Sequence, residues 1–434
     1  MNLDVLIGLI GIGVLLLLFA TGIELGFAMM IVGAAGFACV TNPHAAMNIL
    51  AKDLFDTAAN YGFTVFPLFM LMGQIGFVAG MAGRLYDIAH KWLGHIPGGL
   101  AMATVVGATA FKAICGSSGA TTATFTAIAV PQMDRFGYDK RLSTGIVATV
   151  GTLGVLIPPS VVLIIYGIIT EQSIGKLFMA GLLPGLVIAI FFLVTIYGWC
   201  RIRPEAARGS TPATWKERWS ALPGAIWIAV IFLIVIGGIL LGYFTPTEAG
   251  GVGAFAVLLL ALFQKDLTFK KYVASMKETV RTSGMVMMLI AGSMVLGHFI
   301  TATMIPQIAA DWIVNLPLNR HLILILILFI YILGGSFVED LAFIILATPI
   351  FFPAVVKLGF DPIWFGIALG VVLMIGIVIP PVAVCVFIVS NMTKVPIGTI
   401  YRGVMPFLIA LVIAMILLFI FPQFALWLPS LFFK

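Results

Sequence analysis

The stretch Gly154-Val155-Leu156-Ile157-Pro158-Pro159 returns 222 positions later as Gly376-Ile377-Val378-Ile379-Pro380-Pro381. Other Gly, Pro, aromatic and Asp residues before and after this stretch also recur 222 positions later. In the first copy they are Pro131, Gly137, Tyr138, Asp139, Gly181 and Pro184, and in the second Pro353, Gly359, Phe360, Asp361, Gly403 and Pro406. The pattern indicates a duplicated half-chain. In a membrane, repeats interrupted by Gly and Pro at matching places are typical of transporters that bind substrate between the repeats.

The composition predicts a polytopic membrane protein. Of the 434 residues, 62% are hydrophobic and only 9% are charged, which lies far outside the range of soluble domains. At about 20 apolar residues per crossing, the chain has room for roughly ten to twelve crossings of the bilayer. The net charge of +6 is what basic residues flanking membrane spans produce, so no nucleic-acid partner is inferred. The chain has no HExxH, Walker or nucleophile-elbow motif, which favours a protein that is not an enzyme.

The first half is expected to contain one hairpin and one broken helix. The apolar stretch 98–133 is interrupted by Gly116-Ser117-Ser118-Gly119. Lipid cannot satisfy the backbone groups of such a turn, so we expect a re-entrant hairpin with its tip inside the membrane, surrounded by protein or a water-filled cavity. The span 142–170 contains Pro158-Pro159, and because two consecutive prolines remove two helix donors, this span must break near its middle.

The second half repeats this arrangement. Its hairpin is expected over 320–355 with the tip at Gly334-Gly335-Ser336, and its broken helix over 362–390. Amphipathic stretches at equivalent places, Ala46–Tyr61 and Phe269–Arg281, are expected to lie along the membrane interface as arms. The domains that we predict are a first repeat 1–200, a cytoplasmic connector 201–220 and a second repeat 221–434.

The distribution of positive charge predicts how the halves are oriented. Because each half has an odd number of crossings, the second half should run upside down relative to the first. With the N-terminus outside, 17 of the 23 Lys and Arg residues lie on the cytoplasmic side, as the positive-inside rule requires. These are Arg84, Lys91, Arg135, Lys140, Arg141, Arg201, Arg203, Arg208, Lys216, Arg218, Lys265, Lys270, Lys271, Lys277, Arg281, Lys394 and Arg402. The expected fold is an all-α polytopic membrane protein with an inverted-topology repeat, two re-entrant hairpins and two broken helices.

The hairpin tips and broken helices predict two cation sites. Hard cations prefer oxygen ligands, and the carbonyls freed in broken transporter helices bind Na+. The first site is placed among Gly116, Ser117, Ser118, Gly154, Ile157 and Pro158. The second is placed among Gly335, Ser336, Gly376, Ile379 and Pro380. The alternative is that these Gly and Pro residues only kink tightly packed helices; their matched positions in both repeats favour the binding sites.

Ionisable and hydroxyl side chains near the tips are candidates for substrate binding. Lys112 precedes the first tip and would attract an anion; the alternative is that it extends along an apolar face to the interface. Glu339 and Asp340 follow the second tip, where Asp340 is a candidate contact for substrate; alternatively both cap a helix N-terminus. A polar edge of the first hairpin is suited to substrate hydroxyl or carboxylate groups, unless its side chains bond to their own helix carbonyls. It consists of Thr121, Thr122 and Thr124.

Several stretches together resemble the large membrane subunit of tripartite ATP-independent periplasmic transporters, the DctM-type permease. They are Val65–Gly73, Gly94–Leu100, Ile114–Ser118, Pro131–Tyr138, Gly151–Ser160, Thr245–Ala249, Gly335–Asp340 and Pro380-Pro381. The resemblance covers nearly the whole chain. It implies an elevator-type, Na+-coupled importer in the bacterial inner membrane with a periplasmic N-terminus. A periplasmic substrate-binding protein would deliver a small organic anion, a carboxylate or sulfonate, to this chain and a separate small four-helix membrane subunit.

The chain departs from the family pattern at three places. The first tip has Cys115-Gly116-Ser117 where the family has Ser-Gly-Ser, and the second broken helix has Ile379 where the family often has Thr before the two prolines. Lys112 is not a position that the pattern includes. Two other functions fit the same architecture: a stand-alone dicarboxylate or ion transporter, and an ion channel whose pore uses Gly-rich backbone.

Overall fold

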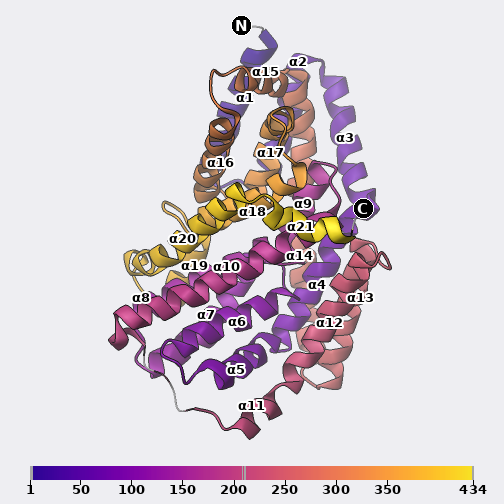
Figure 1. The fold of residues 1–434 in the computed structure, drawn as a ribbon. Coiled ribbons are helices and arrows are strands. Elements are labelled where there is room, and N and C mark those ends of the chain that lie inside the picture. Colours follow the sequence, from indigo (N-terminus) through magenta and orange to yellow (C-terminus); the bar gives the residue numbers. More distant parts are fainter. Residues whose placement is uncertain (1–2, 208, 210–211, 433–434) are drawn as a thin grey trace.

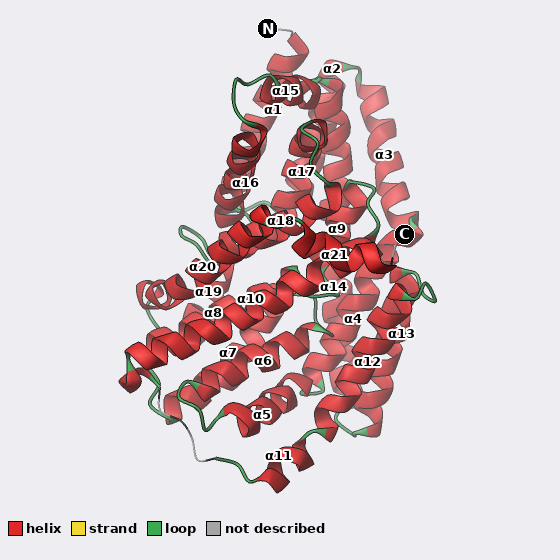
Figure 2. Cartoon of the chain, in the orientation of Figure 1, coloured by secondary structure: helices red, strands yellow, loops and turns green. Residues whose placement is uncertain are grey.

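The computed structural model describes residues 3–207, 209 and 212–432, and within these residues every regular element is a helix (Figure 2). Eight of the described helices are long and apolar enough to cross a membrane. The expected all-α membrane fold is therefore confirmed. Arg208 and Lys434, which the charge count above includes, lie outside the described residues, as does part of the predicted connector.

The first half contains the expected hairpin and broken helix. The helices before the hairpin are α1 (Leu3–Ala20), α2 (Leu25–Val40), α3 (Pro43–Ala59), η1 (Tyr61–Thr64), α4 (Val65–Val78) and α5 (Met81–Leu93). The hairpin consists of α6 (Gly99–Lys112) and α7 (Ser118–Arg135). The broken helix consists of α8 (Lys140–Val150), η2 (Gly151–Val155) and α9 (Val161–Ile169), and α10 (Ile174–Ile202) completes the half. The double proline thus separates two helices, as expected.

The second half follows the same order. After η3 (Pro204–Ala206) and α11 (Trp215–Ala221) come α12 (Pro223–Leu240), α13 (Pro246–Phe263), α14 (Phe269–Ala302) and α15 (Ile305–Val314). The hairpin is α16 (Arg320–Phe337) with α17 (Asp340–Lys357), and the broken helix is α18 (Pro362–Gly376) with α19 (Val384–Thr393). The chain ends with α20 (Ile397–Ile420) and α21 (Gln423–Phe432). The second helices of the two hairpins begin 222 residues apart, in the register of the repeat.

Helices of the two halves pack against each other in exchanged pairs. Helix α2 packs on α14 while α13 packs on α4; α8 packs on α20 while α18 packs on α10. Likewise α9 contacts α17 and α19 contacts α7. Such exchange is what a two-fold relation between equivalent units produces. In Figure 1, α16 and α17 extend from the top of the view and α6 and α7 from the lower left, so the two hairpins approach from opposite sides.

The contact between α2 and α14 shows the repeat at the level of single residues. A methyl group on Gly26 would lie 2.7 Å from the Met288 carbonyl oxygen, and one on Gly292 would lie 3.1 Å from the carbonyl carbon of Gly26. At the equivalent place in the second half, a methyl group on Gly250 would lie 3.1 Å from the Cβ of Leu68. Small residues let membrane helices approach closely. These two contacts pack the first half of the chain directly against the second.

Two expectations about local structure are wrong. The second tip is not at Gly334–Ser336, because α16 continues to Phe337 and the turn lies at Val338 and Glu339. The glycines serve close packing instead: Gly334 faces the Phe343 ring and Gly335 faces Gly376. The second arm and the following span are one continuous helix, α14. In the first half Asn60 ends the arm, since its side chain accepts a hydrogen bond from the backbone N–H of Gly62.

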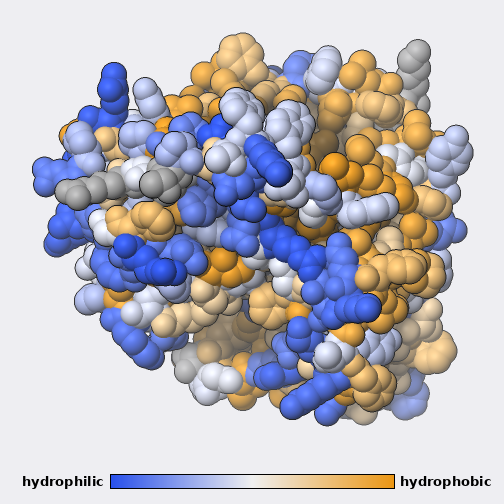
Figure 3. Space-filling view, turned by 90° about the horizontal axis from the view of Figure 1, so that it is seen from below, coloured by the Kyte–Doolittle hydropathy of each residue, from blue (hydrophilic) through white to orange (hydrophobic). Residues whose placement is uncertain are grey.

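Hydrophilic residues spread over much of the lower face of the molecule (Figure 3). This is the end at which Figure 1 places α11, which belongs to the connector between the halves. The same end is where the charge distribution places the cytoplasmic side.

Candidate functional site

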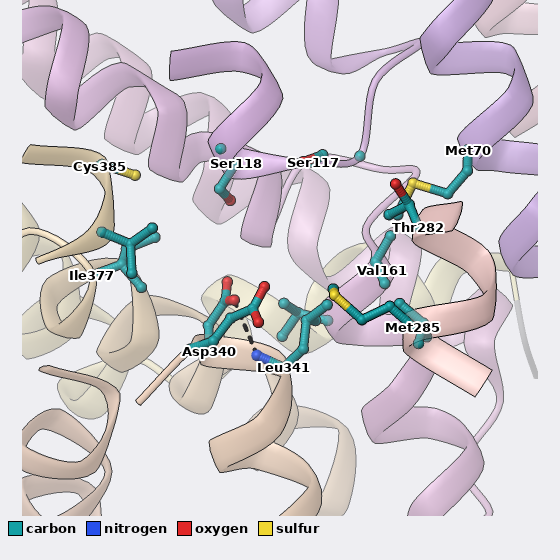
Figure 4. A pocket seen from close by; sticks show the side chains of 16 residues that line it. Met70, Ser117, Ser118, Val161, Thr282, Met285, Asp340, Leu341, Ile377 and Cys385 are labelled. Carbon is teal, nitrogen blue, oxygen red and sulfur yellow. Dashed lines mark hydrogen bonds between the residues drawn. The ribbon is translucent and has the colours of Figure 1, made fainter. Parts of the chain in front are cut away.

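The two hairpin tips meet at one cavity of about 130 Å³. One wall is formed by residues 116–119 of the first tip and the opposite wall by residues 339–341 of the second. Figure 4 shows Ser117 and Ser118 on one side and Asp340 on the other, with Met70, Val161, Thr282 and Met285 along one flank and Ile377 and Cys385 along the other. Residues from both repeats therefore line a single space, as the sequence predicts.

Two helix N-termini open into this cavity. Helix α7 begins at Ser118, and the hydroxyl of its N-cap Ser117 accepts a hydrogen bond from the backbone N–H of Ala120 at 3.3 Å. Helix α17 begins at Asp340, whose carboxylate accepts from the backbone N–H of Leu341 at 3.0 Å. The unpaired N–H groups and the positive end of the helix dipole favour negative groups at such places. The N-terminus of α7 therefore suits an anionic group, whereas that of α17 already carries the Asp340 carboxylate.

The broken helices supply carbonyl groups without helical donors. In an α-helix the carbonyl of residue i accepts from the N–H of residue i+4, and proline has no N–H. Pro158 and Pro380 therefore leave the carbonyls of Gly154 and Gly376 without that donor. The next carbonyl in the first copy, that of Val155, accepts from the Ser160 hydroxyl at 2.6 Å instead. The Gly-x-x-x-Pro-Pro spacing thus leaves one buried glycine carbonyl in each repeat without its helical donor.

The residues predicted for the first cation site are brought together, and Lys112 is among them. A methyl group on Gly116 would lie 2.6 Å from the carbonyl oxygen of Pro159, so the tip touches the break. The Lys112 Nζ donates to the carbonyl oxygen of Ser117 at 2.9 Å and lies over Gly154.

The other members of the first site are placed around this contact. The side chain of Ile157 packs against Gly185 of α10; because it is a hydrocarbon, only the Ile157 backbone could be a ligand. Ser118 is on the cavity side of the tip, and Pro158 belongs to the break between η2 and α9.

The residues predicted for the second cation site also meet. A methyl group on Gly376 would lie 3.1 Å from the carbonyl carbon of Gly335, so the end of α18 contacts the end of α16 directly. The carbonyl oxygen of Ser336 accepts from the backbone N–H of Val382, at 3.1 Å. The Ser336 hydroxyl donates to its own helix at Leu333.

Two residues of that site lie past the end of α18. The backbone N–H of Ile379 donates to Ile375 at 3.1 Å, and Pro380 follows it. Cation binding at either site stays a prediction.

The three threonines of the first hairpin lie behind the cavity wall. Thr121, Thr122 and Thr124 are buried, and their hydroxyls donate to the carbonyls of Ser117, Ser118 and Ala120, respectively, within the same helix. This is the alternative that the sequence left open. A direct contact between these hydroxyls and substrate stays a prediction.

Several lining residues were not expected from the sequence. Thr282 and Met285 come from α14, Met70 from α4 and Cys385 from α19. The pair Thr282-Ser283 is polar within an apolar stretch, which was a usable signal. One flank of the cavity is therefore lined by α4 and α14 together with Val161 of α9, rather than by the hairpins (Figure 4).

Comparison with known proteins identifies relatives along nearly the whole chain. The family model described as "Tripartite ATP-independent periplasmic transporter, DctM component" matches residues 12–424. The chain is 38% identical to the C4-dicarboxylate TRAP transporter large permease protein DctM of Pseudomonas aeruginosa, over 88% of this chain and 89% of that protein. It is 34% identical to the sialic acid TRAP transporter large permease protein SiaM of Vibrio cholerae, over 96% of both. The solved structure of the Alcanivorax borkumensis YdaH transporter has a similar fold, with a TM-score of 0.57 and 14% identity over 89% of this chain and 90% of that one.

Proposed function

This chain belongs to the DctM component of tripartite ATP-independent periplasmic transporters, and we propose that it imports a small organic anion, a carboxylate or sulfonate, together with Na+. As a multi-pass membrane transport protein it moves its substrate without chemical change. We place it in the bacterial inner membrane with its N-terminus in the periplasm, because that orientation puts 17 of the 23 basic residues on the cytoplasmic side.

One observation carries the proposal: the tips of both hairpins and the ends of both broken helices converge on one cavity. The N-terminus of α7 in the cavity wall favours the anion, and the carbonyls at Gly154 and Gly376 favour cations. Opposite charges are thus accommodated side by side at the interface between repeats, which is where inverted-repeat transporters bind substrate and coupling ions.

Coupling between Na+ and substrate follows from charge balance in this proposal. Asp340 already places a carboxylate on the cavity wall, so a second anion would be repelled unless cations bind nearby. Na+ bound at the carbonyls of Gly335 and Gly376 would supply that positive charge. Each ligand then raises the affinity for the other by the same factor, and an inward Na+ gradient drives uptake.

Movement of one bundle against another would carry the site across the membrane. The mobile unit consists of the hairpins α6–α7 and α16–α17 with the broken helices α8–α9 and α18–α19. The scaffold consists of α1–α4 and α12–α14, which the exchanged contacts α2–α14 and α13–α4 hold together. The repeats 1–200 and 221–434, joined by the connector 201–220, each contribute to both units. This is the elevator form of alternating access.

Two partners follow from the family. A periplasmic substrate-binding protein would deliver the anion, and a small four-helix membrane subunit would join this chain on its scaffold. Selection among organic acids would then begin on the binding protein. The same cavity in a stand-alone dicarboxylate or ion transporter would need neither partner, and an ion channel would need no movement of the hairpins.

Reconstitution into proteoliposomes tests the proposal. We expect uptake of a radiolabelled organic anion only with an inward Na+ gradient, the small membrane subunit and the binding protein together. Uptake by this chain alone would favour the stand-alone transporter, and single-channel currents would favour the channel. Uptake that is equally fast when K+ replaces Na+ would overturn the proposed coupling ion.

A further inference from the structure

Lys112 lies where the first cation was expected. Its side chain is fully buried, and Nζ donates to the Ser117 carbonyl oxygen at 2.9 Å. Its alkyl chain covers Gly154: a methyl group there would lie 2.7 Å from Cε and 2.9 Å from Cδ of Lys112. The ammonium therefore stands between the tip of the first hairpin and the break of the first broken helix. These are the two elements whose carbonyls form the predicted site.

The surroundings of the ammonium are those that bind a metal cation. Lys112 is the last residue of α6, and the helix C-terminal end carries partial negative charge. The end of η2 lies beside it through Gly154. The Asp340 carboxylate lines the same cavity as Ser117, whose carbonyl Lys112 contacts. In the described part of the chain, none of the ion pairs includes Lys112, so a backbone carbonyl and helix ends hold its charge, as they would hold Na+.

The second repeat has no counterpart of this lysine. The position 222 residues after Lys112 is Gly334, which packs against the Phe343 ring. Next to it, the backbones of Gly335 and Gly376 are in direct contact. No lysine enters the second site from the equivalent position, whereas one fills the first. The first site thus contains a positively charged side chain of the protein, and the second site has none at the equivalent position.

We propose that the Lys112 ammonium is a tethered cation that takes the place of one coupling Na+ at the first site. This inference rests on the proposed Na+-coupled function, and it extends that function by predicting how many Na+ ions are used in each turnover. The lysine, which is part of the chain, supplies the positive charge that a bound ion would otherwise bring against Asp340 and the anionic substrate. Na+ is then left with the second site, and each turnover uses one Na+ fewer than it would with a neutral residue at position 112.

Counting the Na+ ions bound to the full-length chain in lipid nanodiscs tests this inference. Radioactive sodium is titrated onto the unmodified protein, Lys112→Met, Lys112→Arg, Gly376→Val and the double variant Lys112→Met/Gly376→Val. We expect Lys112→Met to bind one Na+ more than the unmodified protein. Lys112→Arg, which keeps the charge, should bind the unmodified number. Gly376→Val should no longer bind the Na+ that the unmodified protein binds at the second site. The double variant should bind only the one Na+ that Lys112→Met gains at the first site.

The possible failures are distinct. If the unmodified protein binds Na+ in a Gly376-dependent way and Lys112→Met binds the same number, the tethered-cation inference is overturned and the proposed function stands. If neither the unmodified protein nor Lys112→Met binds Na+, both are overturned. Lys112→Ala provides a second neutral variant if the methionine variant is not monodisperse after extraction. A third outcome, an extra Na+ in Lys112→Arg as well, would also contradict the inference, because the charge at 112 would then not exclude the ion.

Discussion

Ser118 and Asp340 stand 222 positions apart, begin the second helices of the two hairpins, and face each other across one cavity (Figure 4). They are equivalent positions of the duplicated halves, yet one carries a hydroxyl and the other a carboxylate. The repeats therefore keep the same backbone design and differ in charge where a ligand would bind.

Asp340→Asn should lower Na+-dependent uptake by roughly tenfold or more, because the lost interaction involves a charged group. It should also raise the Na+ concentration needed for half-maximal uptake, since the negative charge that the cations balance is gone. Ser118→Ala is the matched control and should change both quantities by less. An Asp340→Asn protein with unchanged Na+ dependence would show that this carboxylate has no part in coupling.

Gly376→Ala should abolish Na+-dependent uptake while the protein remains folded. The added methyl group would lie 3.1 Å and 3.2 Å from backbone carbons of Gly335. Backbone atoms cannot change rotamer as a side chain can, so the ends of α16 and α18 must move apart. Gly237→Ala in α12 is the control, since its added methyl group would have no atom within 4 Å. Uptake that survives in Gly376→Ala would remove this contact from the site.

Gly292→Ala should destabilise the scaffold by about 1–3 kcal/mol, the usual effect of overpacking. Its methyl group would lie 3.1 Å and 3.2 Å from backbone carbons of Gly26, where α2 and α14 are in direct contact. Thermal unfolding of the detergent-solubilised protein measures the change. Gly297→Ala, on the same helix but facing open space, should unfold at the unmodified temperature. Equal unfolding temperatures for the two variants would mean that this contact contributes little to stability.

Tyr166→Phe should lower stability by about 1 kcal/mol and leave the cavity intact. The Tyr166 hydroxyl donates to the Pro362 carbonyl oxygen at 2.6 Å, which ties α9 of the first repeat to α18 of the second. Tyr197→Phe, whose ring is exposed on α10, is the control. An unfolding temperature that falls equally in both variants would point to a general effect of losing a hydroxyl.

Local chemistry made much of the fold predictable. Pro158-Pro159 and Pro380-Pro381 break helices wherever they stand, so both breaks were placed correctly. The first tip was placed only in part: Gly116 and Ser117 lie in the turn, whereas Ser118 and Gly119 begin α7. Gly334 and Gly335 were misplaced because glycine serves both turns and close packing, and only the neighbours Phe343 and Gly376 decide between them.

The direction of single side chains was less predictable. The Lys112 side chain points to Gly154 rather than to the membrane interface. Its direction therefore depends on a residue 42 positions further along the chain. Thr282 lines the site because one half of the chain packs on the other. No local sequence pattern predicts that packing.

The central claim is that substrate and coupling ions bind between the two hairpin tips, and cysteine protection tests it most directly. The half-buried Ser118 and Ser293 are each replaced by Cys in a background without the four native cysteines; Ser293 lines a separate cavity of about 250 Å³ beside α1 and α17. Labelling by a small thiol reagent is then followed in membranes with and without Na+ and the transported anion. We predict that Na+ and anion together slow labelling of Ser118→Cys several-fold and leave Ser293→Cys unchanged. Protection at Ser293→Cys alone, or at neither position, would contradict the account.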